Sequence, residues 1–327
     1  MRLGVIGAGK IIPFHLEAAL NAGFSLESIV ATKNSINAKH ISEEFKFKKC
    51  FSDISEFKSR LNELDAILVA SEASTLFPIL SLVASHGIPI LIEKPIFTDI
   101  TQLNLAENIP NAEKIFVGYN RRFYRTIIEI RNFIIENPLA IVKFTIPELS
   151  DTRFNNSESI KKTLTENAVH MLDLAQYFFG ANSLSLDKLD RATVKSDYVR
   201  VSLSEDNLKY CELLFGYADN YSIEVLSNGR RVQIKPLEIL KIYDEMEIMQ
   251  PDQNFPFKRY LPKVSSEVSS HIIEKSEFKP GFELMHKEFI NFVQGIHSNT
   301  AANLKDAINV SAFAIGLQEL LMNDCNN

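Results

Sequence analysis

The chain has 327 residues, of which 46% are hydrophobic and 23% charged, as in an ordinary soluble globular protein. A single hydrophobic core rarely extends over this length, so we expect two domains. The net charge of -6, without a long basic run, argues against nucleic acid or an anionic membrane as a partner.

The three cysteines, Cys50, Cys211 and Cys325, have no regular spacing. We therefore expect neither a structural metal site nor a disulfide framework. No apolar run is long enough to span a membrane, and the first apolar stretch is too short for a secretory signal. These features favour the cytoplasm as the location.

Strand-like apolar runs alternate with helical periodicity through residues 1–118, the pattern of a parallel α/β sheet. Strands are predicted at Arg2–Ile6, Ser28–Ala31, Lys49–Phe51, Ala66–Ala70, Pro89–Ile92 and Ile115–Gly118. Helices are predicted at Ile11–Ala22, Ile36–Phe45, Thr75–Ser85 and Thr101–Ile109, with Asp53 and Thr98 as N-caps and Gly23 and Gly87 as helix ends. This order predicts an α/β Rossmann domain, with a doubly wound parallel sheet, over residues 1–119.

The pattern changes after Gly118. Helices are predicted at Phe123–Ile135 and Leu164–Phe179, around a strand at Ile141–Ile146, and residues 192–248 carry strand patterns with a hairpin signal at Asn228-Gly229. Three prolines in Gln250–Ser276 favour an irregular segment, and two helices at Gly281–Gly295 and Leu304–Asn323 close the chain. We predict an α+β domain over residues 120–327, built on a mostly antiparallel sheet.

A glycine-rich turn, Gly7-Ala8-Gly9-Lys10-Ile11-Ile12, joins the first strand to the first helix. Gly7 suits the tight turn, and Gly9 allows the backbone to approach a pyrophosphate. The start of the helix, with Lys10 and Ile11, then offers free N–H groups to the anion. Ile12 replaces the third glycine of the dinucleotide-binding fingerprint, at a position that serves helix–strand packing. Nucleotide binding is the favoured interpretation, and an ordinary βα turn is the alternative.

The end of the second strand bears on the choice of cofactor. NAD sites usually have Asp or Glu there for the ribose 2′-hydroxyl, but this chain has Val30-Ala31-Thr32-Lys33-Asn34. Thr32 can donate a hydrogen bond to a 2′-phosphate, and Lys33 supplies the opposite charge. We therefore predict NADP(H) in preference to NAD(H), unless Lys33 is only a solvated loop residue.

Another site signal is Glu93-Lys94-Pro95, which directly follows the apolar run Ile88–Ile92. In an open parallel sheet, ligands bind at the carboxyl ends of the strands. A buried strand that brings a carboxylate and a lysine to this edge is expected to contribute to the site.

Further motifs are Gly118–Phe123, Glu166–Asp173, the hairpin around Gly229 and Pro280-Gly281-Phe282. Together with the glycine turn and Glu93-Lys94-Pro95, these motifs resemble the Gfo/Idh/MocA family of glucose–fructose oxidoreductase-like and inositol dehydrogenase-like enzymes. In order and spacing the resemblance covers most of the chain. It implies a Rossmann domain, a large open-faced sheet often used for oligomerisation, and nicotinamide-dependent chemistry on sugars or related polyols.

The resemblance also implies roles for single residues. Lys94 corresponds to the family's active-site lysine, which lies near the reacting oxygen, and His170 to its general acid/base. Glu93 would lie beside the nicotinamide ribose. Glu166 stands where the family often has Asp, four residues before His170, and is expected in the catalytic site.

One departure from the family lies after the fourth predicted strand. The family often has Thr-Pro-Asn there, and this chain has Ser71-Glu72-Ala73-Ser74. We expect Ser71 to contact the cofactor. A carboxylate at Glu72 would change how the ribose or pyrophosphate is held.

Several of these residues also have simpler interpretations. A histidine such as His170 on an apolar helix face is often a packed core residue, and Glu166 could be a solvated glutamate in a first helical turn. His15 is expected to pack within the first helix. Arg121 and Arg122 would either bind a substrate phosphate or tie the two domains together.

These observations favour an NAD(P)-dependent oxidoreductase that acts on a sugar-type substrate as a homodimer or homotetramer. A redox-neutral, cofactor-dependent glycoside hydrolase and a non-catalytic NADP-sensing regulator are the alternatives. A phosphorylated or nucleotide-linked sugar would suit the arginines near the domain junction, which are Arg121, Arg122, Arg125 and Arg153.

Overall fold

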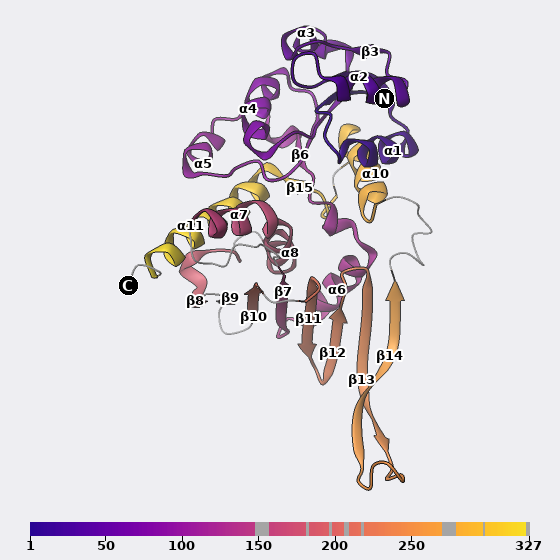
Figure 1. The fold of residues 1–327 in the computed structure, drawn as a ribbon, viewed down its shortest axis with the longest axis vertical. Helices are drawn as coiled ribbons and strands as arrows, with labels where there is room; N and C mark the ends of the chain where they lie inside the picture. Colours follow the sequence, from indigo (N-terminus) through magenta and orange to yellow (C-terminus); the bar gives the residue numbers. More distant parts are fainter. Residues whose placement is uncertain are drawn as a thin grey trace.

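Two β-sheets organise the chain, one above the other in Figure 1, with helices between them. The computed structural model describes residues 1–147, 157–180, 183–195, 198–205, 209–216, 219–269, 279–296 and 298–324. Within these residues, the first sheet has 7 strands and the second has 8.

The first sheet is the doubly wound Rossmann sheet that the sequence predicted. It contains β1 (Arg2–Ile6), β2 (Ser25–Val30), β3 (Lys49–Cys50), β4 (Ala66–Val69), β5 (Ile90–Ile92), β6 (Ile115–Val117) and β15 (Ala302–Asn303). The order is β15-β6-β5-β4-β1-β2-β3, and only the β15–β6 pair is antiparallel. Strands β4 and β5 are continuous buried apolar runs, as expected inside a parallel sheet covered on both faces.

Helices cover both faces of this sheet: α1 (Ile12–Ala22), α2 (Ile36–Glu44), α3 (Ile54–Lys58), α4 (Ala73–Val83) and α5 (Ile100–Ala106). The predicted ends at Gly23 and Gly87 are confirmed, since both residues are left-handed. Asp53 caps α3 as predicted. The prediction of Thr98 as a cap was wrong, because the carboxylate of Asp99 accepts the N–H of Gln102 and caps α5.

The second sheet is large and mostly antiparallel, as predicted. It contains β7 (Ile141–Ile146), β8 (Leu189–Lys195), β9 (Tyr198–Glu205), β10 (Lys209–Phe215), β11 (Ser222–Ser227), β12 (Arg230–Ile234), β13 (Ile239–Met249) and β14 (Arg259–Ser269). The order is β14-β13-β12-β11-β7-β10-β9-β8, with β7 and β10 parallel. Asn228 and Gly229 form the predicted turn between β11 and β12.

The prediction of an irregular segment over Gln250–Ser276 was wrong in its centre, where the 11-residue strand β14 pairs with β13. The prolines in this segment argue against a central strand. However, β14 is the outermost strand of the sheet, and an edge strand tolerates a proline such as Pro262 because one side of its ladder is unpaired.

The helices of the second half are α6 (Arg125–Glu136), α7 (Ser157–Lys162), α8 (Val169–Phe179), α10 (Phe282–Val293) and α11 (Leu304–Asp324), with a short 3-10 helix η4 (Asn120–Phe123) before α6. The helix predicted over Leu164–Phe179 is not continuous. A π-helical turn, η5 (Thr163–Asn167), separates α7 from α8.

Two segments from the end of the chain return to the first sheet. Helix α10 packs beside α1, and its Phe282 and Met285 share a buried cluster with Ile12 and Leu16 (Figure 1). Strand β15 extends the edge of the sheet next to β6. The Rossmann sheet is therefore covered and extended by residues from the second half of the chain.

Of the cysteines, Cys50 is exposed and Cys211 is buried, both with free thiols, and Cys325 lies outside the described residues. Within the described ranges, none of the helices combines the length and the apolar character needed to cross a bilayer.

Candidate active site

All predicted cofactor residues except Glu93, which follows β5, come after three neighbouring strands, β1, β2 and β4. The N–H of Gly7 donates to the carbonyl oxygen of Val30 at 2.8 Å, which joins the ends of β1 and β2. Because ligands bind at the carboxyl edge of such sheets, these residues share one candidate binding edge. They are Gly7, Gly9, Lys10, Ile11, Thr32, Lys33 and Ser71.

The glycine turn fits the pyrophosphate of a dinucleotide. Gly7 has φ of +127°, and a Cβ there would lie 1.9 Å from the carbonyl oxygen of Ala70, so only glycine can occupy the position. A Cβ at Gly9 would meet nothing within 4 Å, so the space over the turn is open. Helix α1 begins without a side-chain cap, which leaves N–H groups of its first turn for an anion. Ile12, the first residue of α1, is fully buried.

The loops after β2 and β4 border the same edge. Thr32 and Lys33 are exposed there. The hydroxyl of Ser71 accepts a hydrogen bond from Thr75 Oγ1 at 2.8 Å. Glu72 precedes α4 without capping it, and its side chain is exposed, so its carboxylate lies at the candidate binding edge.

A buried chain of polar contacts runs from the carboxyl end of β5 into α1 and α10. The carboxylate of Glu93 contacts Nε2 of His15 at 2.9 Å, and Nδ1 of His15 contacts Nε2 of His286 at 3.0 Å. Both imidazoles are fully buried. The second carboxylate oxygen of Glu93 accepts the N–H of Lys94 at 3.1 Å.

These contacts fix the charge of Glu93. Burial acts to raise the pKa of Glu93, but the hydrogen bond and charge of His15, followed by the charge and N–H of Lys94, outweigh it and hold the pKa below its ordinary value. Burial, with a smaller effect from His15, holds the pKa of His286 well below that of a free imidazole. Glu93 is therefore ionised and His286 neutral near pH 7.

Lys94 meets the second half of the chain at the π-helical turn. The Lys94-Pro95 peptide bond is cis. Nζ of Lys94 donates to the carbonyl oxygen of Glu166 at 3.3 Å. Turns of this kind occur frequently at functional sites. The structure thus brings Lys94 and Glu166 together, through the backbone of Glu166.

His170 is the second residue of α8, next to this turn. Its Nδ1 is buried without a hydrogen-bond partner in the described part of the chain. Burial, and then the charges of Lys94, Arg121 and Lys279, hold the pKa of His170 well below its usual value. The imidazole is therefore neutral at physiological pH, and it is not the fully hydrogen-bonded core histidine of the simpler interpretation.

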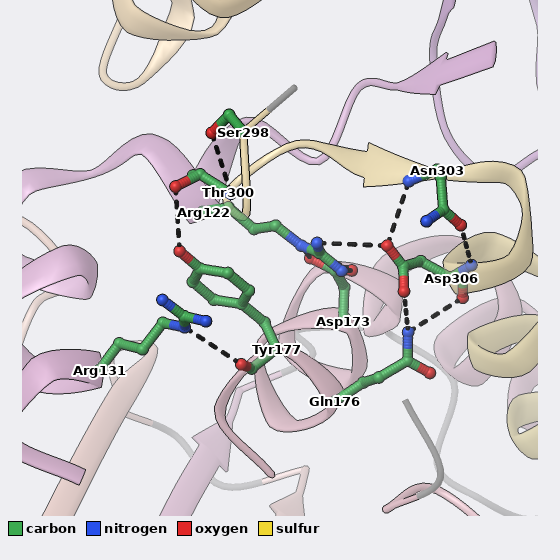
Figure 2. A network of polar contacts seen from close by, with 9 residues as sticks. All are labelled: Arg122, Arg131, Asp173, Gln176, Tyr177, Ser298, Thr300, Asn303 and Asp306. Carbon is green, nitrogen blue, oxygen red and sulfur yellow. Dashed lines mark hydrogen bonds and ion pairs between the residues drawn. The ribbon is translucent and has the colours of Figure 1, made fainter. Parts of the chain in front are cut away.

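Arg122 joins three elements, as Figure 2 shows. Its guanidinium donates to both carboxylate oxygens of Asp173 from α8, at 2.6 to 3.1 Å, and lies 3.4 Å from the carboxylate of Asp306 in α11. The side chains of Arg122 and Asp173 are 3% and 1% exposed. Burial raises the pKa of Asp173 to about 6, against the opposing attraction of Arg122. The structure gives Arg122 a structural role within the second half of the chain, since both of its acidic partners, Asp173 and Asp306, lie there; these pairs do not tie the two predicted domains together.

Further contacts extend this network on α8 (Figure 2). Nε2 of Gln176 donates to the carboxylate of Asp306 at 3.0 Å, and Asp306 exchanges hydrogen bonds with Asn303 at the start of α11. The hydroxyl of Tyr177 contacts Thr300 Oγ1 at 3.3 Å. Helix α8, which carries His170, is therefore held against α11 and η4 along its first turns.

The sequence interpretation missed the contact that His15 makes with Glu93, and it did not single out His286. His15 does lie on a buried helix face, as expected. The only available signal was the presence of a histidine on the apolar face of each helix, between Phe14 and Leu16 in α1 and after Met285 in α10. This pattern does not show that the two histidines contact each other, nor that His15 contacts Glu93.

Residues 1–117 match the Gfo/Idh/MocA family model, described as an oxidoreductase family with an NAD-binding Rossmann fold. This match supports the resemblance to the Gfo/Idh/MocA family over the Rossmann half of the chain. It is 28% identical over 135 residues to the rhizopine catabolism protein MocA of Rhizobium meliloti, which covers 41% of this chain and 42% of that protein.

Other relatives extend the match. The chain is 22% identical over 185 residues to myo-inositol 2-dehydrogenase of Thermotoga maritima, 55% of each protein. The chain thus spans about half the length of the curated relatives it matches. The crystal structure of UDP-N-acetylglucosamine 3-dehydrogenase from Acidithiobacillus ferrooxidans superposes with a TM-score of 0.70 at 17% identity, over 98% of this chain and 97% of that one. At this identity the likeness shows the fold, for both halves of the chain.

Proposed function

We propose that this protein is an NAD(P)-dependent oxidoreductase that transfers a hydride between a nicotinamide cofactor and an alcohol carbon of a sugar or sugar derivative. The observation that supports it most directly is the meeting of Lys94 with the turn that precedes His170, at the edge of the sheet where a dinucleotide fits. The names of the relatives agree, since they include dehydrogenases of myo-inositol and of UDP-N-acetylglucosamine.

In this proposal, each polar group has one task. A bound nicotinamide supplies the hydride acceptor for oxidation and the hydride donor for reduction. Lys94 donates a hydrogen bond to the reacting oxygen and stabilises the negative charge on it. The neutral imidazole of His170 takes the hydroxyl proton as the carbonyl forms, and returns it in the reverse direction. Glu166 fixes the Lys94 ammonium through its carbonyl oxygen, and Glu93 borders the nicotinamide ribose.

The first test is the change Lys94→Ala. We expect kcat/KM for the substrate found in a polyol and sugar screen to fall by about 100- to 10,000-fold, with cofactor affinity nearly unchanged. Lys114→Ala is the matched control, because the ammonium of Lys114 binds the carbonyl oxygen of Gly87, away from the site. Sugar release without net formation of reduced cofactor would instead support the glycoside hydrolase, and cofactor binding without turnover the regulator.

We infer that the cofactor is NADP(H) in preference to NAD(H), because Thr32 and Lys33 are exposed beside the glycine turn and can bind a 2′-phosphate. Lys33→Glu should weaken NADPH binding by about 10- to 100-fold, the equivalent of one charge-assisted hydrogen bond, and leave NADH binding almost unchanged. Lys39→Glu, in the exposed face of α2, controls for net charge. Calorimetric titration measures both affinities, and a wild-type protein that binds NADH at least as tightly would contradict the inference.

We also infer a homodimer or homotetramer that covers part of the second sheet. The hairpin β13–β14 extends beyond the rest of the molecule in Figure 1 and has large exposed apolar side chains. These are Met246, Ile248, Phe255, Phe257, Tyr260, Leu261 and Val264. Light scattering at micromolar concentration measures the mass, and a monomer would contradict this assembly.

A further inference from the structure

The charges that act on the imidazole of His170 are positive. Within the described residues, the charged groups that act on this imidazole are Lys94, Arg121 and Lys279. The nearby carboxylate of Glu93 is already bound to His15 and to the N–H of Lys94. The site that we propose for substrate therefore has an excess of positive charge.

Arg121 differs from its neighbours in having no acidic partner among the described residues. Arg122 is bound to Asp173, and Arg125 pairs with Glu129 one turn along α6. The guanidinium of Arg121 instead lies over the ring of Tyr221, 4.2 Å from its centre. The fourth arginine near the predicted domain junction, Arg153, lies outside the described residues. Among the described residues, Arg121 is therefore the arginine of this group that is available to bind a ligand.

One nitrogen of Arg121 is an unsatisfied donor. Nη1 is buried and has no hydrogen-bond partner within the described chain. A buried donor without an acceptor costs free energy, so its presence indicates an acceptor that the protein itself does not supply. The planar guanidinium fits the paired oxygens of a carboxylate or phosphate, and stacking on an aromatic ring fixes its plane.

Lys279 is held on the same side of the site by the segment that enters α10. Nδ2 of Asn120 donates to the carbonyl oxygen of Pro280 at 3.1 Å, which joins this segment to η4. At Gly281, φ is +79° and a Cβ would lie 2.3 Å from the carbonyl oxygen of Asn120, so the close approach requires glycine. The side chain of Lys279 is exposed, with its ammonium 5.4 Å from the ring centre of Phe14.

We propose that the substrate is an anion, a sugar derivative whose carboxylate or phosphate group is bound by Arg121 and Lys279, beside Lys94 and His170. The proposal rests on the proposed function for the location of the substrate. Carboxylate and phosphate offer the same paired oxygens, so the experiment must distinguish a sugar acid from a sugar phosphate. A hydroxyl of a neutral polyol could accept a hydrogen bond from Nη1 of Arg121, but it would leave the charge of the guanidinium uncompensated.

The experiment uses inorganic phosphate and acetate as probes. The protein is first saturated with NADPH, which fills the pyrophosphate site and whose own shift in Tm tests the proposed function separately. Each ion is then titrated at constant ionic strength maintained with chloride, and thermal unfolding gives its Kd. The variants are Arg121→Gln and Lys279→Gln, with Arg125→Gln as the control because Arg125 is 48% exposed and pairs with Glu129 at the surface.

We expect a saturable rise in Tm with at least one ion, and a Kd that is about 10-fold or more weaker in Arg121→Gln, a typical loss for a charge-assisted pair. Lys279→Gln should show a smaller loss, and Arg125→Gln none. Tighter phosphate binding indicates a sugar phosphate, and tighter acetate binding a sugar acid. The proposal is overturned if neither ion exceeds chloride, or if Arg121→Gln and Arg125→Gln respond alike.

Two further outcomes are also decisive. If Arg121→Gln does not fold, the variant Lys279→Gln is used instead, because Lys279 is exposed. Equal ion affinity in Lys279→Gln and wild type then overturns the proposal. If NADPH gives no shift, the proposed function fails, but the comparison of Arg121→Gln with Arg125→Gln still decides whether an anion site exists.

Discussion

Replacement of Arg122 by methionine should destabilise the protein by an amount that depends on pH. Arg122 and Asp173 are almost fully buried and joined by three hydrogen bonds. Removal of one partner of such a pair costs about 3–5 kcal/mol, because the other charge stays buried without compensation. In wild type, burial already raises the pKa of Asp173 to about 6 from its usual value of 3.8. Without Arg122, which opposes this rise, the pKa must be higher still.

The sign of the pH dependence follows from linkage. When folding raises the pKa of a carboxyl group, its contribution to stability is fully present below the pKa of the unfolded chain. Between the unfolded-state pKa and the folded-state pKa, the free energy of unfolding falls by about 1.4 kcal/mol per pH unit. In wild type this fall ends near pH 6 for Asp173. In Arg122→Met it continues above that pH, so the difference in unfolding free energy between the proteins grows as pH rises beyond about 6.

Urea denaturation followed by circular dichroism at about pH 5 and pH 8 measures this difference, since the chain has no tryptophan for fluorescence. Arg125→Met is the control. Its exposed pair with Glu129 is of the i,i+4 type, for which about 0.3–0.5 kcal/mol is typical at either pH. A loss below about 1 kcal/mol in Arg122→Met, or an equal loss at both pH values, would refute the reasoning.

Three more changes test the cofactor edge. Gly7→Ala should lower Tm and abolish NADPH binding, because the added Cβ would meet the carbonyl oxygen of Ala70. Gly9→Ala should keep the wild-type Tm and weaken only NADPH binding, since its Cβ enters open space. Equal Tm values for the two variants would contradict this. His15→Leu removes the hydrogen bond that lowers the pKa of Glu93. The pKa of Glu93 then rises because the carboxyl is buried, so the stability lost relative to wild type should grow as pH rises above 4.5, the usual pKa of a glutamate. A loss independent of pH in urea denaturation would contradict this.

The sequence predicted most of the Rossmann sheet because its signals are local. Apolar runs such as Ala66–Val69 are buried on both sides. Gly23, which adopts the left-handed conformation, ends the helix directly before it, so the sequence signal and the structure lie at the same place. Strand β14 was missed because the tolerance of Pro262 depends on the position of the strand at the edge of the sheet. That position is a property of the whole sheet and cannot be inferred from a local pattern.

The site was predicted from the sequence only in part, for a similar reason. The glycine turn and Lys94 carry their own motifs, whereas the partner of Arg122 depends on how α8 and α11 pack. The π-helical turn was also missed, since the residues before His170 read as a continuous helix. Contacts between residues far apart in the chain, such as that of Lys94 with the carbonyl oxygen of Glu166, follow from the packing of the two halves.

The nucleotide-binding half of this protein depends on the end of the chain for its chemistry as well as for its core. Glu93 owes its lowered pKa first to His15, whose other nitrogen meets His286 from α10. Helix α10 reaches that position through Gly281, where the chain passes against the backbone of Asn120. The segment that positions Lys279 near His170 therefore also completes the buried contacts of Glu93. The proposed cofactor side and the proposed substrate side are joined by one short stretch of backbone, so a change there should affect both.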